Sequence, residues 1–159
     1  TNLPPGTYWV QVSSNSGAAT IVQATVAASP PRAMGDNCPG VAVRPDMGPT
    51  TLSTMGFVAN GDYGTSCGGA NTNNGDAVFT FTTTAARDVT VDVSATGGAG
   101  LSLELNRTCG DRMTAVPMCT TGNPARRLFR NLPAGTYYVV VDGWEIPAFG
   151  PYSLVVTVQ

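Results

Sequence analysis

The segment VTVDVS at residues 89–94 decides the fold class of this chain. Its apolar residues fall at every second position, which is the pattern of a β-strand with one buried face. The same alternation occurs in LSLELN at residues 101–106 and in YSLVVTV at residues 152–158. No segment of the sequence has an apolar stripe with the 3.6-residue period of a helix. Further strands are predicted over residues 52–58, 77–84, 113–118, 127–131 and 137–142.

Short polar turns separate the predicted strands. NG at residues 60–61 and GG at residues 97–98 are dipeptides typical of tight turns. Short strands at regular spacing with polar turns predict an all-β fold, an antiparallel β-sandwich or jelly-roll-like domain. Residues 137–141 are apolar on both faces, so we expect them to form a central strand that is covered on both sides.

One phrase occurs twice in the chain. NLPPGTYWVQV at residues 2–12 returns as NLPAGTYYVVV at residues 131–141, and residues 20–26 match residues 152–158 in the same way. A repeat this long indicates an array of whole domains, because solenoid units run to about 20–50 residues. We therefore expect residues 1–29 to be the terminal hairpin of a partial preceding repeat or a strand-exchange segment, residues 30–34 a Pro-rich linker, and residues 35–159 a complete domain.

The composition argues against two kinds of partner. The 159 residues have a formal net charge of -2, and every basic residue is Arg. The densest basic run is Arg126-Arg127 with Arg130, which is too sparse for binding to the phosphates of nucleic acid. No apolar run approaches the ~20 residues of a membrane-spanning helix. We expect neither nucleic-acid binding nor membrane insertion.

Four cysteines indicate export. An even number without a CxxC motif or any His favours disulfides in an oxidising compartment, at the cell surface or outside the cell, over a zinc site. Four cysteines allow three pairings, and we expect the sequence-local one, Cys38–Cys67 with Cys109–Cys119.

Three phrases carry a resemblance to a known family. GDAVFTF at residues 75–81, LPAGTYYVVVDG at residues 132–143 and GPYSL at residues 150–154 resemble the bacterial pre-peptidase C-terminal domain family. With Cys67 ahead of the first phrase and the Cys109…Cys119 pair, the chain looks like the disulfide-bearing tandem version in secreted proteins of myxobacterial type. The resemblance implies a β-sandwich accessory domain on an exported protein. Some members bind collagen or polysaccharide, and others assist secretion or are cleaved off.

Catalytic motifs are weak, and we expect no enzyme activity. GTSCG at residues 64–68 matches a serine-nucleophile pattern, but the chain has no His to accept the serine proton, so we interpret it as a turn beside a disulfide. Asp92 and Glu104 are the carboxylates considered for glycoside hydrolysis, which needs two such groups in one cleft. We expect both to be outward residues of adjacent strands that serve solubility.

Calcium is the one cofactor that the sequence suggests. Ca²⁺ takes carboxylate and amide oxygens, and NTNNGD at residues 71–76 is rich in both. Asp36, Asp76 and Asp142 are the candidate ligands. The resemblance implies that Asp36, Asp62 and Asp142 converge from other loops, since some relatives bind calcium near the start of the domain. The alternative is that residues 71–76 form an Asx-turn ahead of a strand.

A loop with three large apolar residues is the candidate partner-binding site. Trp144, Ile146 and Phe149 lie in it, whereas the matching loop of the partial repeat is shorter and has no aromatic residue. A structural role is expected in both copies, so the difference points to recognition. The alternative is that the loop folds its aromatic residues onto its own domain.

The sequence thus predicts a non-catalytic structural and interaction module of an exported tandem-repeat or filament-forming surface protein. Its partners are neighbouring repeats or copies of itself, joined covalently or by strand complementation, and extracellular polysaccharide or protein matrix. The alternatives are a carbohydrate- or collagen-binding module and an accessory domain of a secreted hydrolase. The residues expected in the assembly strands are Tyr8, Val10, Val12, Val22 and Val26.

Overall fold

The chain divides into two units, Thr1–Pro30 and Pro31–Gln159. The computed structural model describes residues 7–11, 25, 32–58, 63, 65–67, 75–98, 100–116, 119–143 and 150–159. In the first unit, the described residues belong to no strand, and Tyr8 and Val10 are exposed. The strand expected there is therefore not seen in residues 7–11, while Val12, Val22 and Val26 lie outside the described residues. Their role in assembly stays a prediction.

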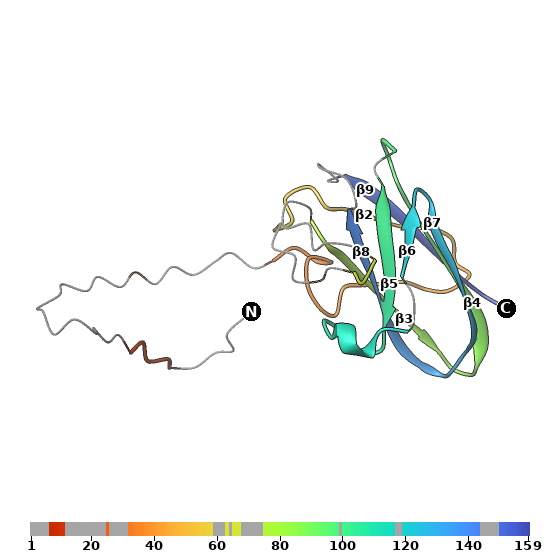
Figure 1. Ribbon diagram of the computed structural model, residues 1–159, viewed down its shortest axis with the longest axis horizontal. Helices are drawn as coiled ribbons and strands as arrows, with labels where there is room; N and C mark the ends of the chain where they lie inside the picture. Colours follow the sequence, from red (N-terminus) through yellow and green to blue (C-terminus); the bar gives the residue numbers. More distant parts are fainter. Residues whose placement is uncertain are drawn as a thin grey trace, which may run out of the picture. The chain divides into compact units, whose positions relative to one another are not determined.

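Two sheets face each other in the second unit, as the sequence predicts (Figure 1). All strand pairs are antiparallel except β1–β3, which is parallel. The five-stranded sheet has the order β1 (Val41–Ala42), β3 (Ala77–Thr83), β8 (Gly135–Gly143), β5 (Leu101–Asn106) and β6 (Thr120–Gly122). The four-stranded sheet has the order β2 (Thr50–Ser53), β9 (Pro151–Val158), β4 (Arg87–Ala95) and β7 (Ala125–Leu132).

The core lies between the inner faces of the two sheets. The alternating residues that define β4 and β5 in the sequence are all inside it, at most 1% exposed. Phe81 of β3 stacks on Tyr137 of β8 with ring centroids 5.6 Å apart. The period-two pattern therefore predicted the buried face of each long strand correctly. The residues concerned are Val89, Val91, Val93, Leu101, Leu103 and Leu105.

β8 and β9 are internal strands of different sheets. β8 pairs with β3 on one side and β5 on the other, and β9 lies between β2 and β4. Most of residues 131–141 belong to β8, and all of residues 152–158 belong to β9. These are the segments that match the start of the chain. In the unit Pro31–Gln159, these segments do not pair with each other as a hairpin.

Two predicted strands are wrong in extent or kind. β2 ends at Ser53 rather than continuing to residue 58, because a turn at Gly56 is closed by a 3.0 Å hydrogen bond from Phe57 N to Thr54 O. A 3₁₀ helix, η1 (Arg112–Thr114), replaces the start of the strand expected at residues 113–118. The Asp111 carboxylate caps this helix by accepting a hydrogen bond from Met113 N.

The domain begins on the edge of β3. Val78 N donates a 2.8 Å hydrogen bond to Gly35 O, and the short strand β1 then runs parallel to β3. Gly40 has φ +80°, and a Cβ placed on it would lie 2.3 Å from Val78 O. This close approach requires glycine, and β1 was too short for the sequence pattern to indicate it.

Candidate functional site

A layer of polar side chains lies on the outer face of the five-stranded sheet, the face opposite the core. It is buried, with each of its members at most 2% exposed. Glu104 is thus on the outer face as expected, but it is not in solvent, so the prediction that it serves solubility is wrong. The residues of this layer are Asp76, Ser102, Glu104, Asn106 and Asp142.

Residues 63 and 65–67 form a covering segment over this layer. Tyr63, Thr65 and Ser66 are hydrogen-bonded to it. Tyr63 N donates to Asp76 Oδ2 at 3.0 Å, and Ser66 N donates to Glu104 Oε2 at 2.6 Å. The Thr65 hydroxyl donates to Ser102 Oγ at 2.7 Å. Two buried carboxylates therefore bind backbone amides, which supplies the hydrogen bonds that burial of a charge requires.

Arg112 adds a positive charge to the same region. Its Nη2 atom donates a 2.9 Å hydrogen bond to Thr65 O, and its guanidinium lowers the pKa of Asp142. Arg112, the first residue of η1, therefore brings one positive charge close to the covering segment and to the carboxylates beneath it.

The structure contains two disulfides, and their pairing differs from the expected one. Cys38 is bonded to Cys109 and Cys67 to Cys119, with Cα–Cα distances of 5.8 and 5.5 Å. All four cysteines are thus in disulfides, as predicted. The local Cys109–Cys119 pairing does not form. Leu103 pairs with Thr120, so residue 119 lies beside the middle of β5, whereas residue 109 lies beyond the end of β5 at Asn106.

Asp76 and Asp142 face each other across two adjacent strands. Burial is the largest cause that raises the pKa of Asp142 to about 7, followed by the charge of Asp76 and a hydrogen bond with it. Gly143 N–H and Arg112 oppose the shift. The two carboxyl groups therefore share a proton over a range of pH in which exposed carboxylates are fully ionised.

The three candidate calcium ligands, Asp36, Asp76 and Asp142, are all among the described residues, whereas Asp62 lies outside them. Asp76 and Asp142 are brought together, whereas Asp36 accepts a hydrogen bond from Val58 N at 3.2 Å. Among the described residues, Glu104 Oε1, Asn106 Oδ1 and Asp142 Oδ1 are buried without a hydrogen-bond partner, and oxygens of this kind suit Ca²⁺. The part of the chain that the structure describes contains no group of three or more His, Cys, Asp or Glu side chains placed to hold a metal ion. Calcium therefore stays a prediction.

A groove lies at the other side of the sandwich, along β7. Residues 127–133 line one wall, and Arg107 and Val116 line the other. Its volume is about 400 Å³, within the range of small-ligand sites. Arg107 follows β5 and also faces Tyr137, whose pKa is raised by burial and lowered by the Arg107 charge. The groove thus lies between β7 and the chain that follows β5.

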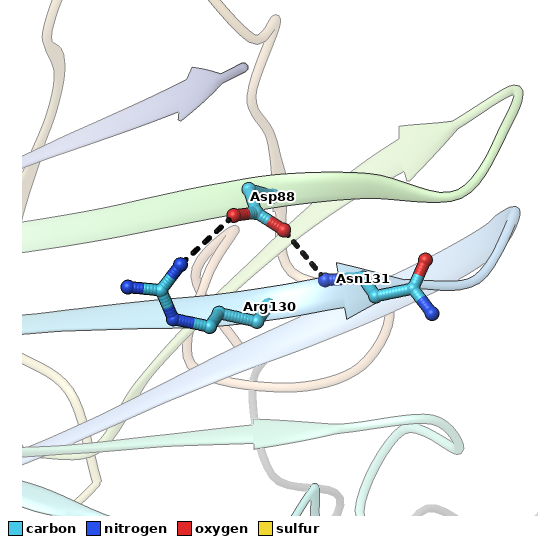
Figure 2. A network of polar contacts seen from close by, with 3 residues as sticks. All are labelled: Asp88, Arg130 and Asn131. Atoms are coloured by element: carbon cyan, nitrogen blue, oxygen red, sulfur yellow. Dashed lines mark hydrogen bonds and ion pairs between the residues drawn. The ribbon is translucent and has the colours of Figure 1, made fainter.

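Asp88 of β4 holds the end of β7 (Figure 2). Its Oδ1 atom accepts a 2.7 Å hydrogen bond from Asn131 N, and its Oδ2 atom lies 3.5 Å from Arg130 Nη1. Asn131 has φ +49°, a value at which the backbone leaves the regular strand. The Asp88 carboxylate therefore stabilises this irregular end and partly neutralises Arg130.

The arrangement of the two sheets matches a solved structure. The crystal structure of the pre-peptidase C-terminal domain of collagenase from Bacillus anthracis is similar to this chain with a TM-score of 0.51, over 81% of this chain and 99% of that domain. The fold is that of a pre-peptidase C-terminal domain. The two sequences are 19% identical, and the likeness concerns the fold. No protein-family model matches the chain, and no curated protein matches it.

Some of the remaining candidates from the sequence are among the described residues, and others are not. Ser66 and Cys67 form a turn and Cys67 is in a disulfide, as the interpretation of GTSCG requires. Trp144, Ile146 and Phe149 lie outside the described residues, so their role in binding stays a prediction. The groove along β7 was missed, although the run of three Arg at residues 126–130 was a visible signal for it.

Proposed function

We propose that this chain is a non-catalytic interaction module of an exported, extracellular or surface protein that contains tandem copies of the pre-peptidase C-terminal fold. The observation that carries the proposal is the match of residues 2–12 and 20–26 to the segments that form β8 and β9. Those two strands are the internal strands on which both sheets depend. A second copy of them has a function only as part of a second copy of the fold.

The covalent form of assembly is favoured over strand exchange. A donated strand normally adds to the exposed edge of a sheet. The counterpart of β8 would instead have to enter between β3 and β5, a position that β8 of the same domain already fills. The leading segment is therefore proposed to belong to an adjoining copy of the fold, joined through the Pro-rich linker.

The positions of the carboxylates support a non-catalytic role. Glu104 lies on the outer face of the five-stranded sheet and holds Ser66 N, while Asp92 is in the four-stranded sheet, 3.8 Å from Arg126. The sequence suggested that these two residues lie on adjacent strands, but they belong to different sheets. Glycoside hydrolysis needs its two carboxylates about 5–10 Å apart around one bond.

The disulfides support export. Cys38–Cys109 and Cys67–Cys119 span 71 and 52 residues, and such bonds are typical of proteins folded in an oxidising compartment. No helix in the described part of the chain is both long and apolar enough to cross a membrane.

Light scattering and limited proteolysis of the 159-residue chain test the two forms of assembly. The covalent form predicts a monomer at every concentration, with rapid cleavage before residue 31 and a resistant fragment from there to Gln159. Strand exchange predicts oligomers that grow with concentration and protection of residues 1–29. Oligomers with a protected leading segment would overturn the proposal.

A further inference from the structure

The covering segment, residues 63 and 65–67, lies over the polar layer without being part of a sheet. None of its residues belongs to a strand. Three hydrogen bonds connect it to side chains of the layer, and Arg112 Nη2 donates one more to Thr65 O. Cys67 adds a covalent bond to Cys119. The segment therefore depends on a few side-chain contacts and on one disulfide.

The Cys67–Cys119 disulfide ties the covering segment directly to the five-stranded sheet. Cys119 immediately precedes β6, which pairs with β5. β5 also carries Glu104, whose Oε2 atom accepts the 2.6 Å hydrogen bond from Ser66 N. The disulfide and this hydrogen bond thus join neighbouring residues of the segment to neighbouring strands, so the disulfide keeps the amide close to its acceptor.

The Cys38–Cys109 disulfide has a different setting. The part of the chain that contains Cys38 is also held by its backbone, since Val78 N donates a hydrogen bond to Gly35 O at 2.8 Å and β1 pairs with β3. Opening Cys38–Cys109 should therefore leave this part of the chain in place. Opening Cys67–Cys119 removes the cross-link of a segment that has no such backbone pairing.

The layer beneath the covering segment favours contact with water. Glu104 Oε1, Asn106 Oδ1 and Asp142 Oδ1 are buried without a hydrogen-bond partner. Burial of such an atom is unfavourable, most of all in a carboxylate, and water relieves it. The apolar core lies on the other face of the sheet, with Leu103 and Val141 among its members. Hydration of the layer therefore leaves the packing between the two sheets intact.

A reductant can reach the Cys67–Cys119 bond. Both cysteines are partly exposed, and Ser66 beside Cys67 is exposed. One thiolate of a dithiol attacks a sulfur of the bond and forms a mixed disulfide, and its second thiolate then displaces the cysteine. The two cysteines gain two electrons and two protons and become thiols, while the dithiol becomes a disulfide.

We propose that Cys67–Cys119 is a redox switch: its reduction by a dithiol releases the covering segment and exposes the polar layer to solvent, while the two sheets stay folded. In the oxidised chain the layer is closed. In the reduced chain Asp76, Glu104 and Asp142 form an anionic surface. The switch is separate from the tandem arrangement of the fold.

Amide hydrogen exchange, followed by ¹⁵N NMR on the full 159-residue chain, tests the proposal. The two reporter amides are those of Tyr63 and Ser66, which donate to buried carboxylates. Cys67→Ser with Cys119→Ser should raise the exchange rate of both at least about tenfold, because local opening breaks both hydrogen bonds. The methyl shifts of core residues should stay as in the parent.

Cys38→Ser with Cys109→Ser is the matched control. It removes a disulfide of similar span, 71 residues against 52, so its effect on global unfolding is similar. It should leave the exchange of the reporter amides within about threefold of the parent rate. Adding dithiothreitol to this control chain reduces Cys67–Cys119 and should give the tenfold rise, which oxidised dithiothreitol should reverse.

Three results overturn the proposal. The first is unchanged exchange of the reporter amides after removal or reduction of Cys67–Cys119. The second is an equal rise in the control chain before reduction, which would assign the effect to global stability. The third is loss of the core methyl shifts in either variant or on reduction of the control, because the sheets would then depend on the bond removed.

Discussion

The backbone amide of Ser66 donates a hydrogen bond of 2.6 Å to Oε2 of Glu104, a residue 38 positions further along the chain. Glu104 is 1% exposed. A carboxylate in the middle of a sheet is thus used to hold a turn over that sheet, beside the Cys67–Cys119 disulfide. Hydrogen bonds to Asp76, Ser102 and Glu104, together with this disulfide, hold the covering segment on the sheet.

Replacing Glu104 by Ala should lower the free energy of unfolding by about 3 kcal/mol, because it removes a buried acceptor and leaves the Ser66 amide above it without a partner. The matched change Asp92→Ala removes a partly exposed carboxylate 3.8 Å from Arg126 and should cost less than about 0.5 kcal/mol. Urea unfolding followed by circular dichroism measures both values. Equal losses would contradict the clamping role of Glu104.

Asp142 should make the stability depend on pH. Its pKa is about 7 in the folded chain against an ordinary value of 3.8, since burial and Asp76 favour the protonated form. The stabilisation is therefore fully present below about pH 4 and is lost as the pH rises through about 7. Asp142→Asn keeps the shape without the charge, so its midpoint of thermal unfolding should gain on the parent's between about pH 5 and pH 8. Asp76 and Arg112 are the charged groups that act on Asp142, so a constant difference between the two midpoints would assign the pH dependence to other groups of the chain.

Calcium can be tested at the same carboxylates. Calcium held by Asp76 and Asp142 would raise the midpoint of the parent at about pH 8 in millimolar CaCl₂, and Asp142→Asn would abolish that rise. MgCl₂ is the control, because Mg²⁺ demands a stricter octahedral geometry. Identical midpoints with and without calcium would contradict the prediction made from the sequence.

The disulfide pairing predicts a large loss on removal of either bond. Closing a loop of 71 or 52 residues stabilises by about 4 kcal/mol on the chain-entropy model, so Cys38→Ser with Cys109→Ser should lower the free energy of unfolding by about that amount. Peptide mapping without reduction should recover Cys38 linked to Cys109. Recovery of Cys109 linked to Cys119 would show that the local pairing forms instead.

Gly40 and Gly48 form a matched pair of substitutions. Both have positive φ, +80° and +88°, but a Cβ at Gly40 would lie 2.3 Å from Val78 O while nothing lies within 4 Å at Gly48. Gly48→Ala should cost about 1 kcal/mol from backbone strain. Gly40→Ala should cost at least about 3 kcal/mol, because β1 must also move away from β3. Similar losses for the two variants in urea unfolding would rule out the steric cause.

The long strands were predictable because their alternation follows from one buried face, as the rows in β4 and β5 show. The alternation does not show which residues cover the opposite face of the sheet. The neighbours of Glu104 in the sequence predict that it faces outward into solvent. It is buried by residues far away in the sequence, such as Ser66, which is 38 positions earlier. The same holds for the disulfides, since sequence distance takes no account of the register that sets residue 119 back from residue 109.

The groove escaped prediction for a similar reason. Three Arg on one strand look like a solvated face when the strand is considered alone. Two of them, Arg127 and Arg130, line a groove together with Arg107, which follows β5 of the other sheet. Proximity between the ends of different strands is a property of the topology, which alternation of residues cannot reveal.

The placement of β8 and β9 has a consequence for transport. These strands are the last two of the domain to be synthesised, and each occupies an internal position, so neither sheet can close before residues 135–158 are available. A chain that is passed through a secretion channel from its N-terminus would therefore stay open until its final segment emerges. For the exported protein proposed above, this order of strands would keep the chain unfolded until residues 135–158 have left the channel.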